Sequence, residues 1–172
     1  MILETERLLV RNWIAADLEH YLALAKDVGY NCFSPPGYFL VGTTQQAEQK
    51  IRDKMALFDE QGLGKFPIFL KASREFIGTC GLEPFDLDAH AEIELGYRLC
   101  LRHWGQGYAT EAASVVLRYG FDQLGWRRIM AFALGENRAS LRVLEKLGFR
   151  YLREFLHAGL PHRLFVLTGL TS

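Results

Sequence analysis

The spacing of hydrophobic residues predicts strands and helices that alternate along the chain. Apolar runs and two-residue alternation predict strands over residues 7–13, 65–71, 75–82, 91–101, 127–133, 149–156 and 162–168. Helical spacing predicts helices over 15–26, 44–62, 108–124 and 138–147. The order is strand, two helices, three strands, helix, strand, helix and two strands. It favours one mixed α/β sheet with helices on both faces.

Turn and cap residues set the ends of several elements. Thr43 followed by Gln46 has the pattern of a capping box, and the helix after it should end near Gly62 or Gly64. Asn137 is a favoured N-cap for the last helix. Pro67 indicates that the strand over 65–71 lies at an edge or that a strand begins there.

The loop between Gly29 and Gly42 is rich in aromatic residues. Two interpretations stay open for these side chains, because they can pack over the core or line a substrate entrance. The four are Tyr30, Phe33, Tyr38 and Phe39.

Composition narrows the possible classes of function. The chain has 172 residues, with 49% hydrophobic and 23% charged, which predicts one globular domain over 1–172 and excludes intrinsic disorder. Twenty basic residues balance twenty acidic ones, so no basic excess favours nucleic acid as a partner. No segment has the roughly 20 apolar residues of a membrane span. The N-terminus does not resemble a secretory signal, and we expect a cytoplasmic protein.

The cysteine pattern argues against a disulfide framework and against a zinc site. Cys32, Cys80 and Cys100 are odd in number and widely spaced, with no C-x-x-C pair. Reduced thiols are expected, and no metal.

The turn from Arg102 to Gly107 is the strongest candidate for a binding site. It connects the strand over 91–101 to a helix, and a helix N-terminus presents unpaired N–H groups and a partial positive charge. Gly105 and Gly107 allow close approach of the backbone to a ligand, so the turn suits a pyrophosphate. It matches neither a P-loop nor a dinucleotide-binding fingerprint. A tight turn that binds nothing is the alternative.

Four segments together resemble the GNAT superfamily of N-acetyltransferases. Residues 102–109, Arg-His-Trp-Gly-Gln-Gly-Tyr-Ala, resemble its [QR]-x-x-G-x-[GA] signature. Residues 5–11 resemble the opening of the RimJ/RimL branch, which acetylates the N-termini of ribosomal proteins. Residues 94–97 resemble the strand before the signature, and residues 137–149 the last helix. The four segments occur in the family's order and span nearly the whole chain.

The resemblance implies a fold and a cofactor. The fold is a central, mostly antiparallel sheet that splays into a V between the strands over 91–101 and 127–133, where the pantetheine arm of acetyl-CoA lies. Backbone groups of Leu99 and Leu101 would pair with that arm. The amides of the signature would hold the pyrophosphate; these belong to Arg102, His103, Trp104, Gly105, Gln106, Gly107, Tyr108 and Ala109. Asn137 and Ser140 would flank the pantetheine or the thioester sulfur. The family needs no metal.

The implied reaction is direct transfer of an acetyl group to a primary amine. A carboxylate is needed to take the amine proton. Glu94 matches the family position for this base, while Glu92 and Glu83 are weaker candidates. The alternative is that Glu94 is an exposed strand carboxylate or a partner of Arg98.

One departure from the family pattern concerns the acid that protonates the leaving thiolate. Relatives place a Tyr seven residues after the Asn, where this chain has Leu144. Ser140 is the nearest substitute, although its alternative role is to support the helix cap. Solvent can also protonate a thiolate, because thiols titrate near pH 8.5.

The acceptor class follows from amine basicity and from the branch resemblance. At pH 7 about one α-amine in seven is neutral, against about one lysine amine in a few thousand. This favours a peptide or protein N-terminus. A small-molecule amine and a non-catalytic acyl-CoA sensor are the alternatives, and we expect a monomer or a homodimer.

Overall fold

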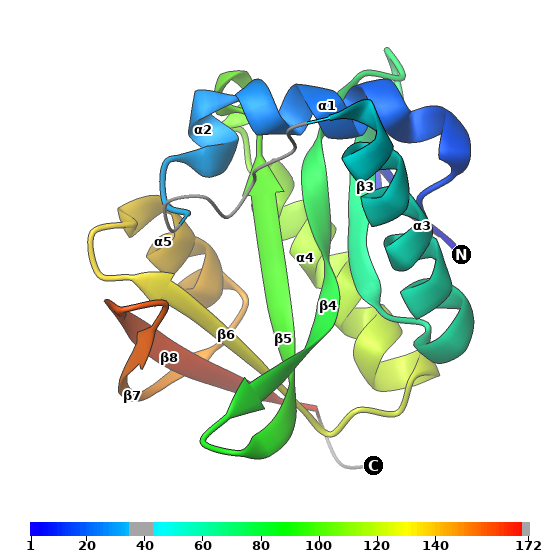
Figure 1. Cartoon of the computed structure of the whole chain (residues 1–172). Coiled ribbons are helices and arrows are strands. Elements are labelled where there is room, and N and C mark those ends of the chain that lie inside the picture. The colour runs from blue at the N-terminus through cyan, green and yellow to red at the C-terminus, as the bar shows by residue number, and fades with distance from the viewer. Residues whose placement is uncertain (35–42, 170–172) are drawn as a thin grey trace.

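The computed structural model describes residues 1–34 and 43–169, and its central feature is one mixed β-sheet (Figure 1). The described strands lie in the order β1-β2-β3-β4-β5-β6-β8-β7. Their bounds are β1 Ile2–Glu4, β2 Leu8–Arg11, β3 Gly64–Leu70, β4 Phe76–Leu87, β5 His90–Leu99, β6 Arg128–Leu134, β7 Arg150–His157 and β8 Leu160–Thr168. The pairs are antiparallel except β5 with β6, which is parallel.

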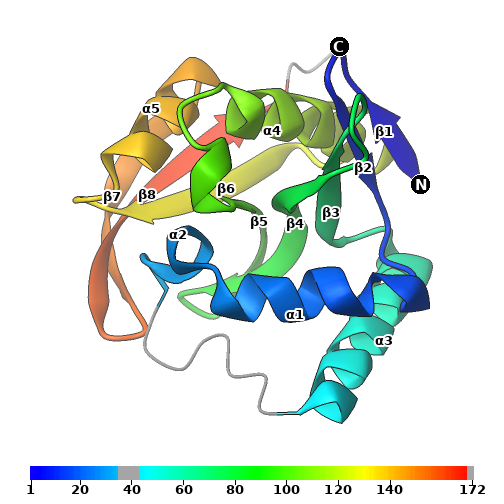
Figure 2. The ribbon, with the colours of Figure 1, turned by 90° about the horizontal axis from the view of Figure 1, so that it is seen from above.

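Helices cover both faces of this sheet (Figure 2). Their bounds are α1 Leu18–Lys26, α2 Val28–Asn31, α3 Thr44–Gln61, α4 Tyr108–Arg118 and α5 Arg138–Lys146. Single 3-10 turns span Ala15–Asp17 and Leu101–His103, and a π turn over Tyr119–Gln123 extends α4. The first three helices lie on one face, and α4 and α5 lie on the other. The predicted mixed α/β fold is therefore confirmed.

The predicted caps are present, because each depends on neighbouring residues. Thr43 accepts a hydrogen bond from the Gln46 amide, and the Gln46 side chain accepts one from the Thr43 amide. The Asn137 side chain accepts from the Ser140 amide at 3.0 Å. Gly62 ends α3 in the left-handed conformation, with φ of +70°.

Several strand boundaries differ from the predicted ones. β4 runs to Leu87 rather than ending at 82, and β5 ends at Leu99 rather than at 101. β1 has only three residues and gives no periodic signal, so sequence analysis missed it. Pro161, predicted to lie in the last loop, belongs to β8. Pro67 lies within β3. At Pro67 the strand pairs with β4 alone, because β2 pairs only with residues 68–70 of β3.

Two hydrophobic cores hold the helices to the sheet. Under α4 the fully buried side chains include Leu8, Ile77, Leu82, Val116 and Ile129. On the other face, under α1 and α3, they include Trp13, Leu24 and Ile51. Cores on both faces fix the sheet between two helical layers.

The parallel pair β5–β6 opens into the expected V (Figure 1). The two strands are in register at a single pair, Glu94 with Met130, and diverge towards their carboxyl ends. Near the closed end, Arg128 Nε donates to Glu92 at 3.0 Å, and the Glu92 side chain is buried. This ion pair links β5 to β6 near the point where the two strands begin to diverge.

Gly81 provides a test of how closely the strands approach. A Cβ added there would overlap the carbonyl oxygen of Gly64 on β3. We therefore expect Gly81→Ala to lower the free energy of unfolding in urea by about 1–3 kcal/mol. Gly135→Ala is the control, because its Cβ would meet only Arg163 side-chain atoms at 3.5 Å or more. Equal stability of both variants would contradict the proposed overlap.

Candidate active site

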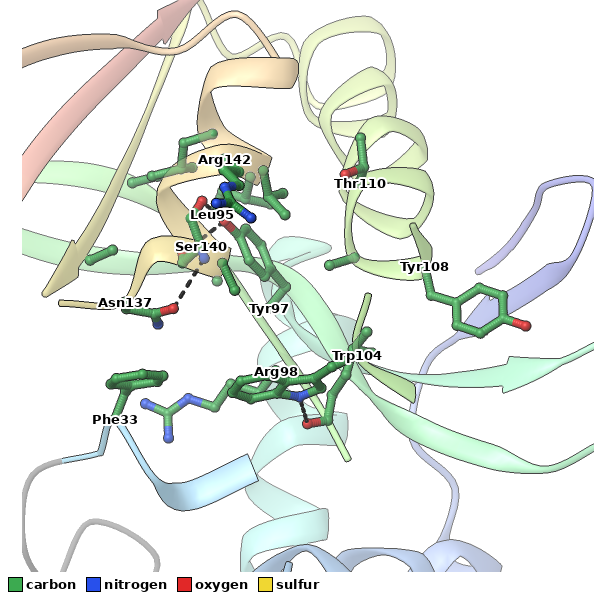
Figure 3. A pocket seen from close by; sticks show the side chains of 18 of the residues that line it. Phe33, Leu95, Tyr97, Arg98, Trp104, Tyr108, Thr110, Asn137, Ser140 and Arg142 are labelled. Atoms are coloured by element: carbon green, nitrogen blue, oxygen red, sulfur yellow. Dashed lines mark hydrogen bonds between the residues drawn. The ribbon is translucent and has the colours of Figure 1, made fainter. Parts of the chain in front are cut away.

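A cavity of about 380 Å³ occupies the gap between β5 and β6 (Figure 3). Its walls come from α2 and the residue Phe33 after it, β3, β5, the turn before α4, the first turn of α4, β6, α5 and β8. The cavity therefore joins the helical layer of α4 and α5 to the opposite face of the sheet.

The turn before α4 forms one end of the cavity. Gly105 and Gly107 have φ of +74° and +83°, a region that residues with a side chain rarely adopt. The Gln106 side chain donates to the Arg102 carbonyl at 3.0 Å and closes the turn. Within the described chain, the amide N–H groups of residues 105–110 have no hydrogen-bond partner. Such a group of N–H donors suits an anion.

The N-terminal segment holds this turn in place from outside the cavity. Arg7 donates from Nη1 to the Gln106 carbonyl at 3.1 Å and from Nε to Glu111 at 2.7 Å. Thr5 Oγ1 lies 2.5 Å from the same carboxylate. Burial alone would raise the pKa of Glu111, but the hydrogen bonds from Thr5 and Arg7 outweigh it and lower that pKa. The Thr5-Glu6-Arg7 segment thus has a structural role.

Most of the predicted cofactor residues line the cavity, and three do not. Those that line it are Leu99, His103, Trp104, Gly105, Gly107, Tyr108, Ala109, Asn137 and Ser140. Leu101 is exposed, Arg102 forms an ion pair with Glu75 at 2.6 Å, and Gln106 faces the turn itself. The Leu99 carbonyl accepts the Trp104 indole N–H at 2.8 Å (Figure 3), so one of its lone pairs is already used.

Glu94 is the candidate base that reaches the cavity. It lies on β5, with 13% of its side chain exposed, and Lys65 Nζ lies 3.4 Å from its Oε2. Burial raises the pKa of Glu94, and the nearby Lys65 ammonium offsets only part of that increase. Glu92 is paired with Arg128, and Glu83 with Lys54 and Lys65, and neither carboxylate lines the cavity. The alternative that Glu94 is an exposed strand carboxylate is wrong, because only 13% of its side chain is exposed.

A tyrosine that sequence analysis missed lies beside Ser140 (Figure 3). The Tyr97 hydroxyl is 2.9 Å from Ser140 Oγ and donates to the Ser140 carbonyl at 3.1 Å. Burial raises the pKa of Tyr97, so its hydroxyl keeps its proton at neutral pH. Ser140 has the cap role considered for it, because its amide donates to Asn137, while its hydroxyl faces Tyr97 and its role as an acid stays a prediction. Leu144 is buried in the core.

The aromatic residues after Gly29 both pack and line the cavity. Tyr30 is buried, and its hydroxyl bonds to Thr79 at 2.8 Å. Phe33 stacks on Trp104, with 6.3 Å between ring centroids (Figure 3). Tyr38 and Phe39 lie outside the described residues. Tyr30 and Phe33 thus pack against neighbouring residues and also line the cavity, and a substrate entrance at this place stays a prediction.

Comparisons with known proteins agree with this arrangement. The family model for the acetyltransferase (GNAT) domain matches residues 7–150. The chain belongs to the GNAT family of acetyltransferases. It is 33% identical over 171 residues to the uncharacterized N-acetyltransferase YoaA of Bacillus subtilis, covering 94% of this chain and 92% of YoaA.

Solved structures of GNAT enzymes share the fold. An acetyltransferase of the GNAT family from Bacillus anthracis superposes with a TM-score of 0.79 at 26% identity, with 98% of each chain covered. RimL, a ribosomal L7/L12 alpha-N-protein acetyltransferase solved in complex with coenzyme A, gives a TM-score of 0.82 at 14% identity, also with 98% of each chain covered. At 14% identity the likeness concerns the fold alone.

Metal ligands, membrane-spanning helices and disulfides are other features that bear on the class of this GNAT enzyme. Within residues 1–34 and 43–169, no group of three or more His, Cys, Asp or Glu side chains is placed to hold a metal ion. Over the same residues, no helix has the length and apolar character to cross a membrane. Cys32, Cys80 and Cys100 are free thiols.

The contact between Glu111 and the N-terminal segment predicts a pH-dependent stability. Because the folded pKa of Glu111 is lowered, its contribution is present above the unfolded value near 4.3 and is lost as pH falls through the folded value. We expect Glu111→Gln to lower the free energy of unfolding by about 1–2 kcal/mol at pH 7. The difference from the wild type should shrink below about pH 4 in urea titrations. Glu60→Gln, on the exposed side of α3, is the control, and a pH-independent difference would contradict the assignment.

Proposed function

We propose that this GNAT enzyme binds acetyl-CoA in the β5–β6 cavity and transfers the acetyl group to the α-amine of a peptide or protein. The carrying observation is that one cavity joins the unpartnered N–H groups of residues 105–110 to the Glu94 carboxylate. The anion-binding turn and the Glu94 carboxylate, a candidate base, therefore line the same cavity.

The turn fits the diphosphate of acetyl-CoA. Six successive amides without a partner, at the N-terminus of α4, provide donors and a partial positive charge. The left-handed glycines leave no side chain between those amides and a ligand. Asn137 and Ser140 of the α5 N-terminus line the same cavity and would flank the pantetheine arm.

Glu94 is proposed as the general base. When bound, acetyl-CoA supplies a thioester whose acetyl group passes to the amine and leaves CoA as a thiol. Glu94 takes the proton that the amine loses, directly or through one water. Its raised pKa brings it nearer to the operating pH, where a base is most effective.

Tyr97 and Ser140 are proposed to stabilise the leaving sulfur. Their hydroxyls lie together in the cavity, 2.9 Å apart, on the side where α5 begins (Figure 3). Tyr97 keeps its proton at neutral pH, and rotation of its O–H away from the Ser140 carbonyl would let it donate a hydrogen bond to a developing thiolate. Tyr97 of β5 would thus provide the hydroxyl that relatives are expected to have from a Tyr on α5, where this chain has Leu144.

A peptide α-amine is the acceptor that we favour. Its lower basicity leaves more of it neutral at pH 7, and RimL, which shares the fold, is named for acetylation of a protein α-amine. A small-molecule amine, or binding without turnover, would be alternative outcomes of the test below.

The test is transfer of radiolabelled acetyl from acetyl-CoA to a panel of N-terminal peptides and small amines. We expect transfer to peptide α-amines, and a fall in kcat of about 100-fold or more for Glu94→Gln. CoA affinity, measured by calorimetry, should stay unchanged in this variant. Glu48→Gln on the exposed face of α3 is the control. Transfer confined to small amines would reject the acceptor class, and CoA binding without transfer to any amine would reject catalysis.

Gly107 gives an independent test of the cofactor site. A valine there would be strained at φ of +83° and would displace the amides that follow it. We expect Gly107→Val to raise the Kd for CoA tenfold or more in calorimetry. Gly159→Val is a matched control, because Gly159 also has a positive φ but lies in the β7–β8 turn. A folded Gly107→Val protein with wild-type affinity would contradict the site.

A further inference from the structure

Four charged side chains form a connected cluster behind the cavity. Lys65 of β3 lies 3.3 Å from Glu83 of β4 and 3.4 Å from Glu94 of β5. Lys54 of α3 lies 3.6 Å from the other oxygen of Glu83. The cluster thus leads from the cavity across three strands to the underside of α3, and it contains two positive and two negative groups.

Two glycines make room for Lys65 to reach Glu94. Lys65 is paired with Gly81 on β4, and Gly81 is paired with Gly96 on β5. A Cβ added to Gly96 would lie 2.6 Å from Lys65 Nζ, closer than side-chain atoms pack. The Lys65 side chain therefore passes over Gly81 of β4 and Gly96 of β5, where no side chains block its way to Glu94.

The two carboxylates compete for this lysine. Glu83 and Glu94 are directly opposite one another in the β4–β5 register, where like charges repel. Glu83 has a second cation, Lys54, whereas the described contacts of Glu94 include only Lys65 as an ion-pair partner. The ionisable groups around Glu94 are Lys65 from β3, Glu83 from β4, Arg98 from β5, Lys54 from α3, Tyr30 from α2 and His162 from β8.

We propose that Lys65 and Glu83 are positioning residues that act through Glu94, Lys65 favouring its ionised form and Glu83 its protonated form. This inference rests on the proposed role of Glu94 as the base. It assigns a function to two residues outside the reacting atoms, because their charges decide in which protonation state the base meets the amine.

The surroundings of the two carboxylates shift their pKa values in the directions that this geometry predicts. Burial is the main reason why the pKa of Glu94 is raised; Lys65 lowers it and Glu83 raises it further. Burial likewise raises the pKa of Glu83, but Lys65 and Lys54 outweigh burial there, so the net shift is downward. The two opposed carboxylates therefore have their pKa values pushed apart, with Glu94 the more basic.

The test is a titration of Glu94 by NMR in the intact protein. Glutamate labelled with carbon-13 at the side-chain carboxyl gives one resonance per residue, and Glu94→Gln identifies the resonance of Glu94. We expect Lys65→Met to raise the midpoint by about one pH unit and Glu83→Gln to lower it, because opposite charges are removed. Lys71→Met and Glu4→Gln remove a comparable pair, 2.8 Å apart on the far side of β3, and should leave the midpoint unchanged.

Kinetics provide a second readout. Dividing kcat/KM of a variant by that of the wild type at each pH removes the effect of the amine's own titration, which is the same for both enzymes. The ratio of kcat/KM for Lys65→Met to that of the wild type should rise with pH, and the ratio for Glu83→Gln should fall. Loss of stability alone would not move the two ratios in opposite directions. Unmoved midpoints, or midpoints that shift in the same sense, would overturn the inference while the effect of Glu94→Gln on transfer stands. If no amine is acetylated, the proposed function fails, and the NMR titration still decides whether Lys65 and Glu83 control Glu94.

Discussion

The structure depends on one incomplete pairing in the sheet. β5 and β6 are parallel neighbours that are in register only at Glu94 and Met130. Beyond that pair, backbone groups on both strands face a gap, and such groups need hydrogen-bond partners. The Trp104 indole satisfies the Leu99 carbonyl from within the chain. The other groups along the gap remain available to solvent or to a bound molecule.

Contacts outside the cavity hold the elements that border this gap. The ion pair of the buried Glu92 carboxylate with the exposed Arg128 side chain joins β5 and β6 near the closed end. Arg7, just before β2, links the N-terminal segment to the Gln106 carbonyl and to Glu111 in the first turn of α4. The turn that presents the free amides is thus held by a segment about one hundred residues earlier in the chain. The site is stabilised by contacts outside it, as preorganised sites require.

Features that depend on neighbouring residues could be predicted from the sequence. The Asn137 cap and the capping box of Thr43 with Gln46 are local, and both are present as predicted. Tyr97 was missed because it is in phase with the apolar residues Leu95 and Leu99 of its strand and so has the pattern of a core residue, and only the packing of α5 brings it to Ser140. Lys65 gave no signal, because its contact with Glu94 depends on the register of three strands.

The charge balance of the cluster bears on how the base would release its proton. With Glu94 ionised, two lysines face two carboxylates, and the cluster is neutral. Proton uptake by Glu94 leaves one excess positive charge in a partly buried region, where charge is poorly solvated. That excess favours return of the proton to solvent before the next amine arrives. In the proposed reaction, the lysine that favours ionised Glu94 before proton transfer would therefore also favour its regeneration afterwards.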